Sequence, residues 1–116
     1  MAKFHEEKEK VTVGNGTVTI NALTGNAQSG YIEAYLWPQL LVSGKESVNA
    51  LAGTGNNLKG KMVRVEALAK DVNVSSDTVV LYVIIKEDGK DVFRKPYSET
   101  TADGETVMFD IQIQLQ

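Results

Sequence analysis

The residues best suited to bind a ligand lie in the alternating segment 31–42. One face of an extended strand there carries Tyr31, Glu33, Tyr35 and Trp37. The other face carries Ile32, Ala34 and Leu36. Three rings and a carboxylate on one face offer a surface on which a sugar ring can stack or a protein partner can pack. We expect the first set to be the ligand-binding surface. The alternative is that the rings face the core and the small residues lie under a loop at 43–60.

Catalytic chemistry has less support. The only histidine is His5, in a charged N-terminal stretch, and the chain has no cysteine, so a histidine-based triad or thiol catalysis is not expected. Two carboxylates can hydrolyse a glycoside, for example Glu33 with Glu66 or Asp110, but the spacing in the sequence does not force them together. We predict that the protein is not an enzyme, and a small enzyme with carboxylate chemistry is the third choice.

Two glycine- or aspartate-containing segments match known binding motifs incompletely. Residues 55–61 fit GxxxxGK, but Met62 stands where a phosphate loop needs Ser or Thr for magnesium. Residues 71–77 have the alternating oxygen ligands of a calcium loop, without its glycine and closing glutamate. We therefore predict no cofactor and no metal, and a looser calcium site at 71–77 stays open as the alternative.

Composition narrows the choice of partner and compartment. The 116 residues include 12 Lys and Arg against 15 Asp and Glu, giving a net charge of −3 and a pI of about 5.1. A nucleic-acid partner is not expected from such a chain. No apolar run reaches the length of a membrane span, so we expect no membrane insertion. The charged N-terminus is not a signal peptide, which leaves a cytoplasmic protein or an exported one whose signal has been removed.

The first half of the chain predicts a tail and then strands. Residues 1–9 are mostly charged and are expected to form a flexible tail, whereas residues 10–116 should form a single β-sandwich domain. Asn15-Gly16 favours a hairpin that pairs Val13 with Val18. A single long strand kinked at the glycines is the alternative. Within 43–60 we expect either a functional loop or a short element around Val48 and Leu51.

The second half gives the stronger strand signals. Residues 61–70 favour a strand, although the letters EALAK also permit a helix, and residues 78–86 are apolar on both faces, as in a central strand. Asp88-Gly89 predicts a turn, and residues 107–115 alternate as a half-buried strand. A two-residue turn at Asp103-Gly104 would place Arg94 opposite Ile113 on the buried face, so we expect a longer loop or a change of sheet there. Either would bring Phe93 and Tyr97 to the core.

About seven short strands separated by turn signals predict an all-β fold, a two-sheet antiparallel β-sandwich. Over residues 10–116 this pattern resembles immunoglobulin-like modules in general, although the Cys…Trp…Cys signature is absent. A small antiparallel β-barrel is the alternative.

Taken together, these features predict a non-enzymatic recognition or adhesion module that binds a carbohydrate or a protein partner through its aromatic strand face. The alternative is a structural subunit of a larger assembly, such as a phage, pilus or secretion particle, with homo-oligomers formed through edge strands. The stripe Gln112, Gln114 and Gln116 would suit such an edge.

Overall fold

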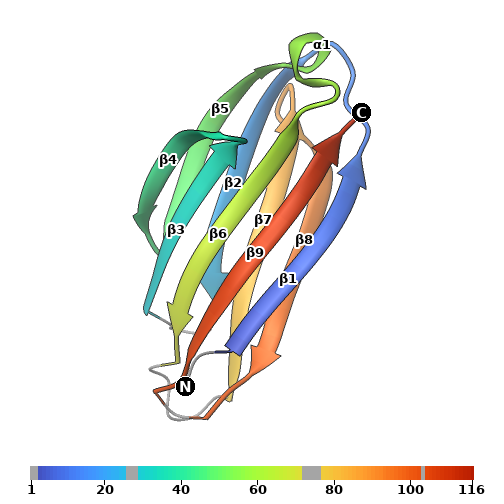
Figure 1. Ribbon diagram of the computed structural model, residues 1–116. Helices are drawn as coiled ribbons and strands as arrows, with labels where there is room; N and C mark the ends of the chain where they lie inside the picture. The colour runs from blue at the N-terminus through green and yellow to red at the C-terminus, as the bar shows by residue number, and fades with distance from the viewer. Residues whose placement is uncertain (1–2, 26–28, 72–76, 103) are drawn as a thin grey trace.

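The computed structural model describes residues 3–25, 29–71, 77–102 and 104–116, which form two β-sheets packed face to face (Figure 1). The larger sheet contains, in spatial order, β1 (Lys3–Val11), β9 (Thr106–Leu115), β6 (Met62–Lys70), β3 (Ser29–Leu36) and β4 (Gln39–Lys45). The smaller contains β5 (Ser47–Thr54), β2 (Thr17–Gly25), β7 (Thr78–Glu87) and β8 (Lys90–Thr100). A single helical turn, α1 (Gly55–Leu58), follows β5. The predicted all-β sandwich is confirmed, and no backbone ladder among the described strands joins the sheets into a barrel.

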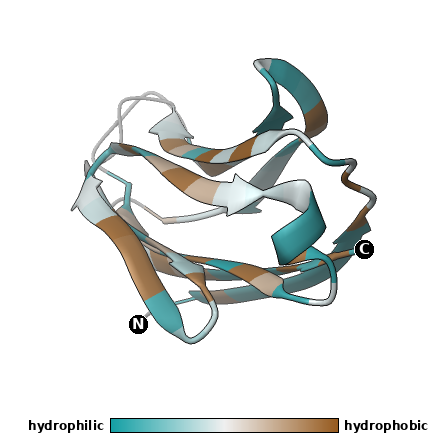
Figure 2. Ribbon diagram, turned by 90° about the horizontal axis from the view of Figure 1, so that it is seen from above, coloured by the Kyte–Doolittle hydropathy of each residue, from teal (hydrophilic) through white to brown (hydrophobic). Residues whose placement is uncertain are grey.

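A hydrophobic core fills the space between the two layers, which Figure 2 shows from above. Every second residue of β9 and β6 points into it, because side chains alternate along a strand. The buried set from these two strands is Val107, Phe109, Ile111, Ile113, Leu115, Val63, Val65, Ala67 and Ala69. Full burial of one large aliphatic side chain stabilises a fold by about 1.5–3 kcal/mol. The strand predictions for 61–70 and 107–115 are therefore correct, and the helical alternative for EALAK is wrong.

β7 is an interior strand of the smaller sheet, as predicted, and it forms a hairpin with β8 through Asp88 and Gly89. Both turn residues have positive φ, 51° and 80°, which a two-residue type I′ turn requires. The hairpin places Glu87 opposite Lys90 and pairs Lys86 with Asp91 in the same way. The chain then changes sheet between β8 and β9, so Arg94 does not face Ile113, and Tyr97 is buried in the core while Phe93 packs against it.

The N-terminal stretch departs from the prediction of a flexible tail at residues 1–9. Residues 3–11 form β1, which pairs in parallel with β9; residues 1 and 2 lie outside the described part of the chain. The tail was predicted because Phe4 is the only apolar residue in the charged stretch 3–10, but polar contacts also hold the strand in place. The inward face of β1 carries His5 and Glu9, which find polar partners on β8, and ends in buried Val11.

The predicted hairpin at Asn15-Gly16 is also wrong, and so is the single kinked strand, because β1 and β2 belong to different sheets. The segment between them crosses over and buries Val13 in the shared core, and β2 adds Val18 to the same core. Two of the segment's backbone N–H groups donate to Glu87, at the end of β7, instead of closing a hairpin, and that of Val13 donates to the carbonyl of Gln116. Gly14 and Gly16 donate to the Glu87 carboxylate over 2.9 and 2.7 Å.

The glycine-rich stretch 43–60 holds the end of β4, the whole of β5 and α1, so it contains regular elements and not a long loop.

β3 ends at Leu36, ahead of the cis peptide bond between Trp37 and Pro38. Ile32 and Ala34 are buried, so the alternative in which the rings of β3 face the core is wrong. β9 lies between β1 and β6, so its glutamine stripe is not on a free edge, contrary to expectation.

Candidate functional site

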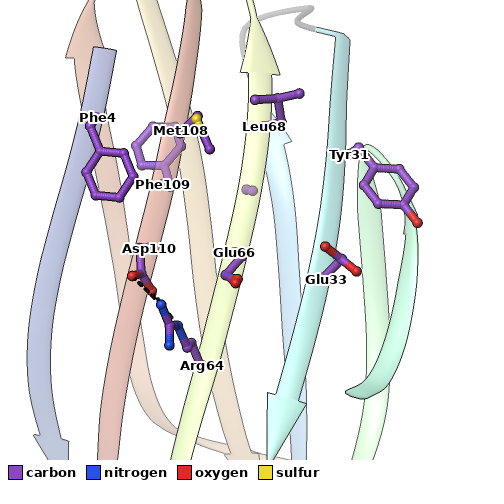
Figure 3. Close-up of a pocket in the computed structure, with 10 residues that line it drawn as sticks. Phe4, Tyr31, Glu33, Arg64, Glu66, Leu68, Met108, Phe109 and Asp110 are labelled. Carbon is purple, nitrogen blue, oxygen red and sulfur yellow. Dashed lines mark hydrogen bonds and ion pairs between the residues drawn. The ribbon is translucent and has the colours of Figure 1, made fainter. Parts of the chain in front are cut away.

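The candidate site lies on the outer face of the five-stranded sheet, the face turned away from the four-stranded sheet. The strand register arranges the outward side chains in rows that cross four adjacent strands (Figure 3). The first row, here called the apolar row, consists of Phe4, Met108, Leu68 and Tyr31. The next row along the strands, here called the acidic row, consists of Glu6, Asp110, Glu66 and Glu33.

The apolar row exposes four large side chains that no other part of the described chain covers. Their exposed fractions lie between 43% for Met108 and 63% for Phe4. Single exposed apolar residues are common on proteins, whereas a contiguous set on neighbouring strands is a candidate interaction surface. On the four-stranded sheet, Leu51 and Tyr82 are also exposed, but the strand register places them in different rows.

The acidic row is organised around Arg64, which projects from β6 at the next level. Arg64 donates two hydrogen bonds to the Asp110 carboxylate, from Nε over 2.9 Å and from Nη2 over 2.8 Å. This hydrogen bonding raises the pKa of Arg64 above its ordinary value against the opposing effect of burial, and the charges of Asp110, Glu66 and Glu6 act in the same direction. The pair allows Asp110 to be buried, with only 8% of its side chain exposed.

The guanidinium of Arg64 also covers one face of the indole of Trp37, at 4.4 Å from the ring centroid. Tyr35 meets the same indole edge-on, with the ring centroids 5.4 Å apart. Burial is the main cause that raises the pKa of Tyr35, followed by the charges of Glu33 and Glu66 and a hydrogen bond with Glu33. Tyr35 is therefore a neutral hydroxyl that ties the rings to the acidic row.

A cavity of about 350 Å³ lies between the apolar and acidic rows. Its wall includes three members of the acidic row and all four members of the apolar row, together with Arg64 and the edges of Ala67 and Phe109. Figure 3 shows Phe4, Met108 and Leu68 at one level and Asp110, Glu66 and Glu33 at the next. The cavity thus offers an apolar wall on one side and carboxylate oxygens on the other.

The four residues predicted from sequence share this outer face but do not share one cavity. Tyr31 and Glu33 line the cavity, whereas Tyr35 and Trp37 lie beside it, with Trp37 43% exposed. The carboxylates suggested as a pair do come together, because Glu33 is opposite Glu66 and Glu66 is opposite Asp110.

Sequence reasoning missed Phe4, Leu68, Met108 and Arg64. Leu68 and Met108 carried a usable signal, since each is an apolar residue in the outward phase of its strand. Phe4 was assigned to the tail, and its role depends on the pairing of β1 with β9. Nothing in the spacing of Arg64 and Asp110 indicated that the two would meet.

The only histidine lies away from this cavity, at a polar seam that joins β1 to β8. His5 Nδ1 shares a hydrogen bond with the Glu99 carboxylate. Glu9 accepts hydrogen bonds of 2.7 Å from both Lys95 Nζ and Tyr97 Oη. Burial alone would raise the pKa of Glu9, but these bonds and the Lys95 charge hold it below its ordinary value. Burial, with the bond to Glu9, raises the pKa of Tyr97.

The other candidate motifs do not become sites in the described part of the chain. Gly55 begins a single helical turn, and a strand follows at Met62, so residues 55–62 lack the long helix of a phosphate loop. Of the calcium-like segment, 72–76 lies outside the described residues, and Asp71 accepts a 2.7 Å bond from Thr101. Among the described residues, no three carboxylate or histidine side chains are grouped to hold a metal ion.

None of the helices described is long and apolar enough to cross a membrane. No protein-family model, no curated protein and no solved structure matches this chain.

Proposed function

We propose that this protein is a non-enzymatic recognition module that binds its partner through the outer face of the five-stranded sheet. The observation that carries the proposal is the cavity of about 350 Å³ between the apolar and acidic rows, with Tyr31 and Glu33 on its wall. Ligand sites are typically concave, largely apolar and equipped with a few polar groups, and their volumes begin at about 300 Å³. Rigid strands hold all of these side chains, which suits a preformed binding surface.

A binding role without catalysis is supported by how the polar groups are engaged. Both carboxyl oxygens of Asp110 already accept hydrogen bonds from Arg64, so they are not free to contact a reacting substrate atom. His5 is engaged at the seam with Glu99, on the inward side of β1. We accordingly propose recognition in preference to carboxylate catalysis.

The ligand is a carbohydrate or a protein partner. Exposed rings at Tyr31 and Trp37 would suit a sugar, but Arg64 covers one face of Trp37, which leaves one face for stacking. Leu68 and Met108 are flexible aliphatic side chains, which are better suited to pack against protein side chains. We also propose that the sandwich is immunoglobulin-like, as the strand pattern of residues 10–116 suggests.

The experiment is a glycan array and a protein capture assay, each performed with the wild-type protein and two variants. Tyr31→Ala removes a ring from the cavity wall and should abolish binding of the true ligand. Tyr82→Ala removes an exposed ring from the outer face of the four-stranded sheet and should leave binding intact. The proposal would be contradicted if both variants lost ligand binding equally, or if neither variant lost it.

A structural subunit of an assembly is the second candidate. Its sequence support was the glutamine stripe, which lies on an interior strand. The free edges of the sheets are instead β1, β4, β5 and β8. Size-exclusion chromatography with light scattering separates the two candidates. Edge-to-edge assembly requires oligomers whose size grows with protein concentration, whereas a recognition module does not require oligomers.

A further inference from the structure

We infer that the cavity between the apolar and acidic rows binds an extended segment of a protein partner in which basic and apolar side chains alternate. This inference rests on the proposed function and names the chemistry of its ligand. Three observations carry it: the exposed apolar row, the surplus of carboxylates beside it and the spacing between the two rows.

The acidic row carries more negative charge than its own surroundings neutralise. Arg64 is bonded to Asp110 and so accounts for one carboxylate. Within the part of the chain that the structure describes, Glu6, Glu33 and Glu66 form no ion pair. Like charges on neighbouring strands repel one another, so a cation placed over this row relieves repulsion as well as gaining attraction. The row therefore favours a cationic ligand group and disfavours phosphates.

The apolar row requires that the same ligand also bring apolar groups. Phe4, Met108, Leu68 and Tyr31 expose large side chains along one line across four strands. Covering apolar surface stabilises a complex by roughly 25 cal/mol per Å² before the costs of association. A simple inorganic cation or a uniformly charged peptide would leave this row in contact with water. The ligand must therefore be amphipathic.

The spacing of the rows selects an extended chain over a helix. The rows are two residues apart along each strand, which is about 7 Å, and cross four strands, which is about 14 Å. An extended chain lying between the rows would send alternate side chains to each side, and four to five residues would span the line. A helix is about 10–12 Å wide and does not fit between rows 7 Å apart. Alternation of basic and apolar residues follows from this geometry.

A second copy of this chain is a weaker occupant. On its edge strand β8 the adjacent cations Arg94 and Lys95 are already bonded, to Asp91 and Glu9 over 2.8 and 2.7 Å. Binding of β8 would have to break these pairs or share them. A separate partner with unpaired basic side chains meets no such competition.

The test uses defined peptides and the full chain, with affinity measured by calorimetry at two salt concentrations. The probe is the acetylated, amidated peptide Lys-Leu-Lys-Leu-Lys, and its controls are Lys-Lys-Lys-Leu-Leu, which has the same composition, and Glu-Leu-Glu-Leu-Glu. We expect the alternating basic peptide to bind at least tenfold more tightly than either control, and its affinity to fall with added salt.

Matched variants locate the site. The double variant Glu33→Gln, Glu66→Gln should weaken binding of the probe at least tenfold, and Leu68→Ser should also weaken it. The control Asp77→Asn, Asp91→Asn removes two charges from the four-stranded sheet side and should change affinity less than twofold. Circular dichroism and urea unfolding of each variant ensure that lost binding is not lost folding.

Three results would overturn the inference, and they are distinguishable from failure of the proposed function. These are equal binding of the alternating and block peptides, equal loss with the control variant, or oligomers that the Glu33 and Glu66 changes dissolve, which would indicate a second copy. If the probe fails while a glycan or another protein binds in a Tyr31-dependent manner, the ligand chemistry is wrong and the recognition surface stands. If the probe fails and no glycan or protein binds in a Tyr31-dependent manner either, the proposed recognition surface is itself wrong.

Discussion

Arg64 and Asp110 form a two-pronged ion pair across neighbouring strands β6 and β9, with bonds of 2.9 and 2.8 Å. The pair does two things at once on the outer face. It permits a carboxylate to be buried within a sheet surface, and it holds the guanidinium at the junction between the acidic row and Trp37. One side chain of the cavity wall, Arg64, therefore contacts both Asp110 and Trp37.

Removal of this arginine should destabilise the fold. Arg64→Ala leaves the buried Asp110 carboxylate without its ion-pair partner and with only the 3.3 Å hydrogen bond from Gln112, which we expect to cost about 2–4 kcal/mol, between the values for exposed and fully buried pairs. Arg64→Lys keeps the positive charge but loses the pair of hydrogen bonds from Nε and Nη2, so its loss of stability should be smaller than that of Arg64→Ala. Urea unfolding measures both. An Arg64→Ala protein that unfolds at the wild-type urea concentration would show that the pair is not structural.

Trp37 is the only tryptophan, so its fluorescence reports directly on the outer face. With 43% of the residue exposed, its emission should be that of a partly hydrated indole and should be quenched by acrylamide. Arg64→Ala uncovers one face of the ring and should increase the quenching constant. Emission shifted to the blue and insensitive to acrylamide would mean that the indole is buried and unable to contribute to a binding surface.

The strand pattern made much of the fold predictable. Alternation in 61–70 and 107–115 placed the inward residues correctly, and Asp88-Gly89 gave the turn and its cross-strand pairs. Non-local pairing was the limit. Nothing local in residues 3–9 shows that β9 offers a free edge, and nothing at Asn15-Gly16 shows that Glu87 will satisfy its amides better than a hairpin would. The cavity was missed for the same reason, since it is made by register across four strands.

The seam between β1 and β8 should weaken in acid. The folded state holds the pKa of Glu9 below the 4.5 expected of an unfolded chain, so the seam's contribution is complete above that pH and is lost as the pH falls through the folded pKa. Glu9→Gln should remove this part of the pH dependence and, by weakening the acceptor of Tyr97, cost about 1–2 kcal/mol. Urea unfolding at a series of pH values tests this. Parallel pH profiles for both proteins would contradict it.

β1 should behave as a strand in solution. Its backbone pairs with β9 from Lys3↔Val107 to Val11↔Leu115, so its bonded amides should exchange with deuterium at least about a hundredfold more slowly than those of a free peptide of residues 1–11. Hydrogen exchange followed by NMR measures this residue by residue. Amide exchange rates equal to those of the peptide would show that residues 3–11 form a flexible tail, and Phe4 would then not belong to the cavity wall.

A chemical-shift map with a bound ligand would show whether binding takes place on the outer face of the five-stranded sheet. The ligand is whichever glycan, protein or peptide proves to bind in a saturable manner. We predict that the largest backbone amide shifts cluster at Phe4, Tyr31, Leu68 and Met108, with the indole signal of Trp37 moving at the same ligand concentrations. Shifts that cluster on β2, β7 or β8, with this face unchanged, would mean that the binding surface lies on the four-stranded sheet instead.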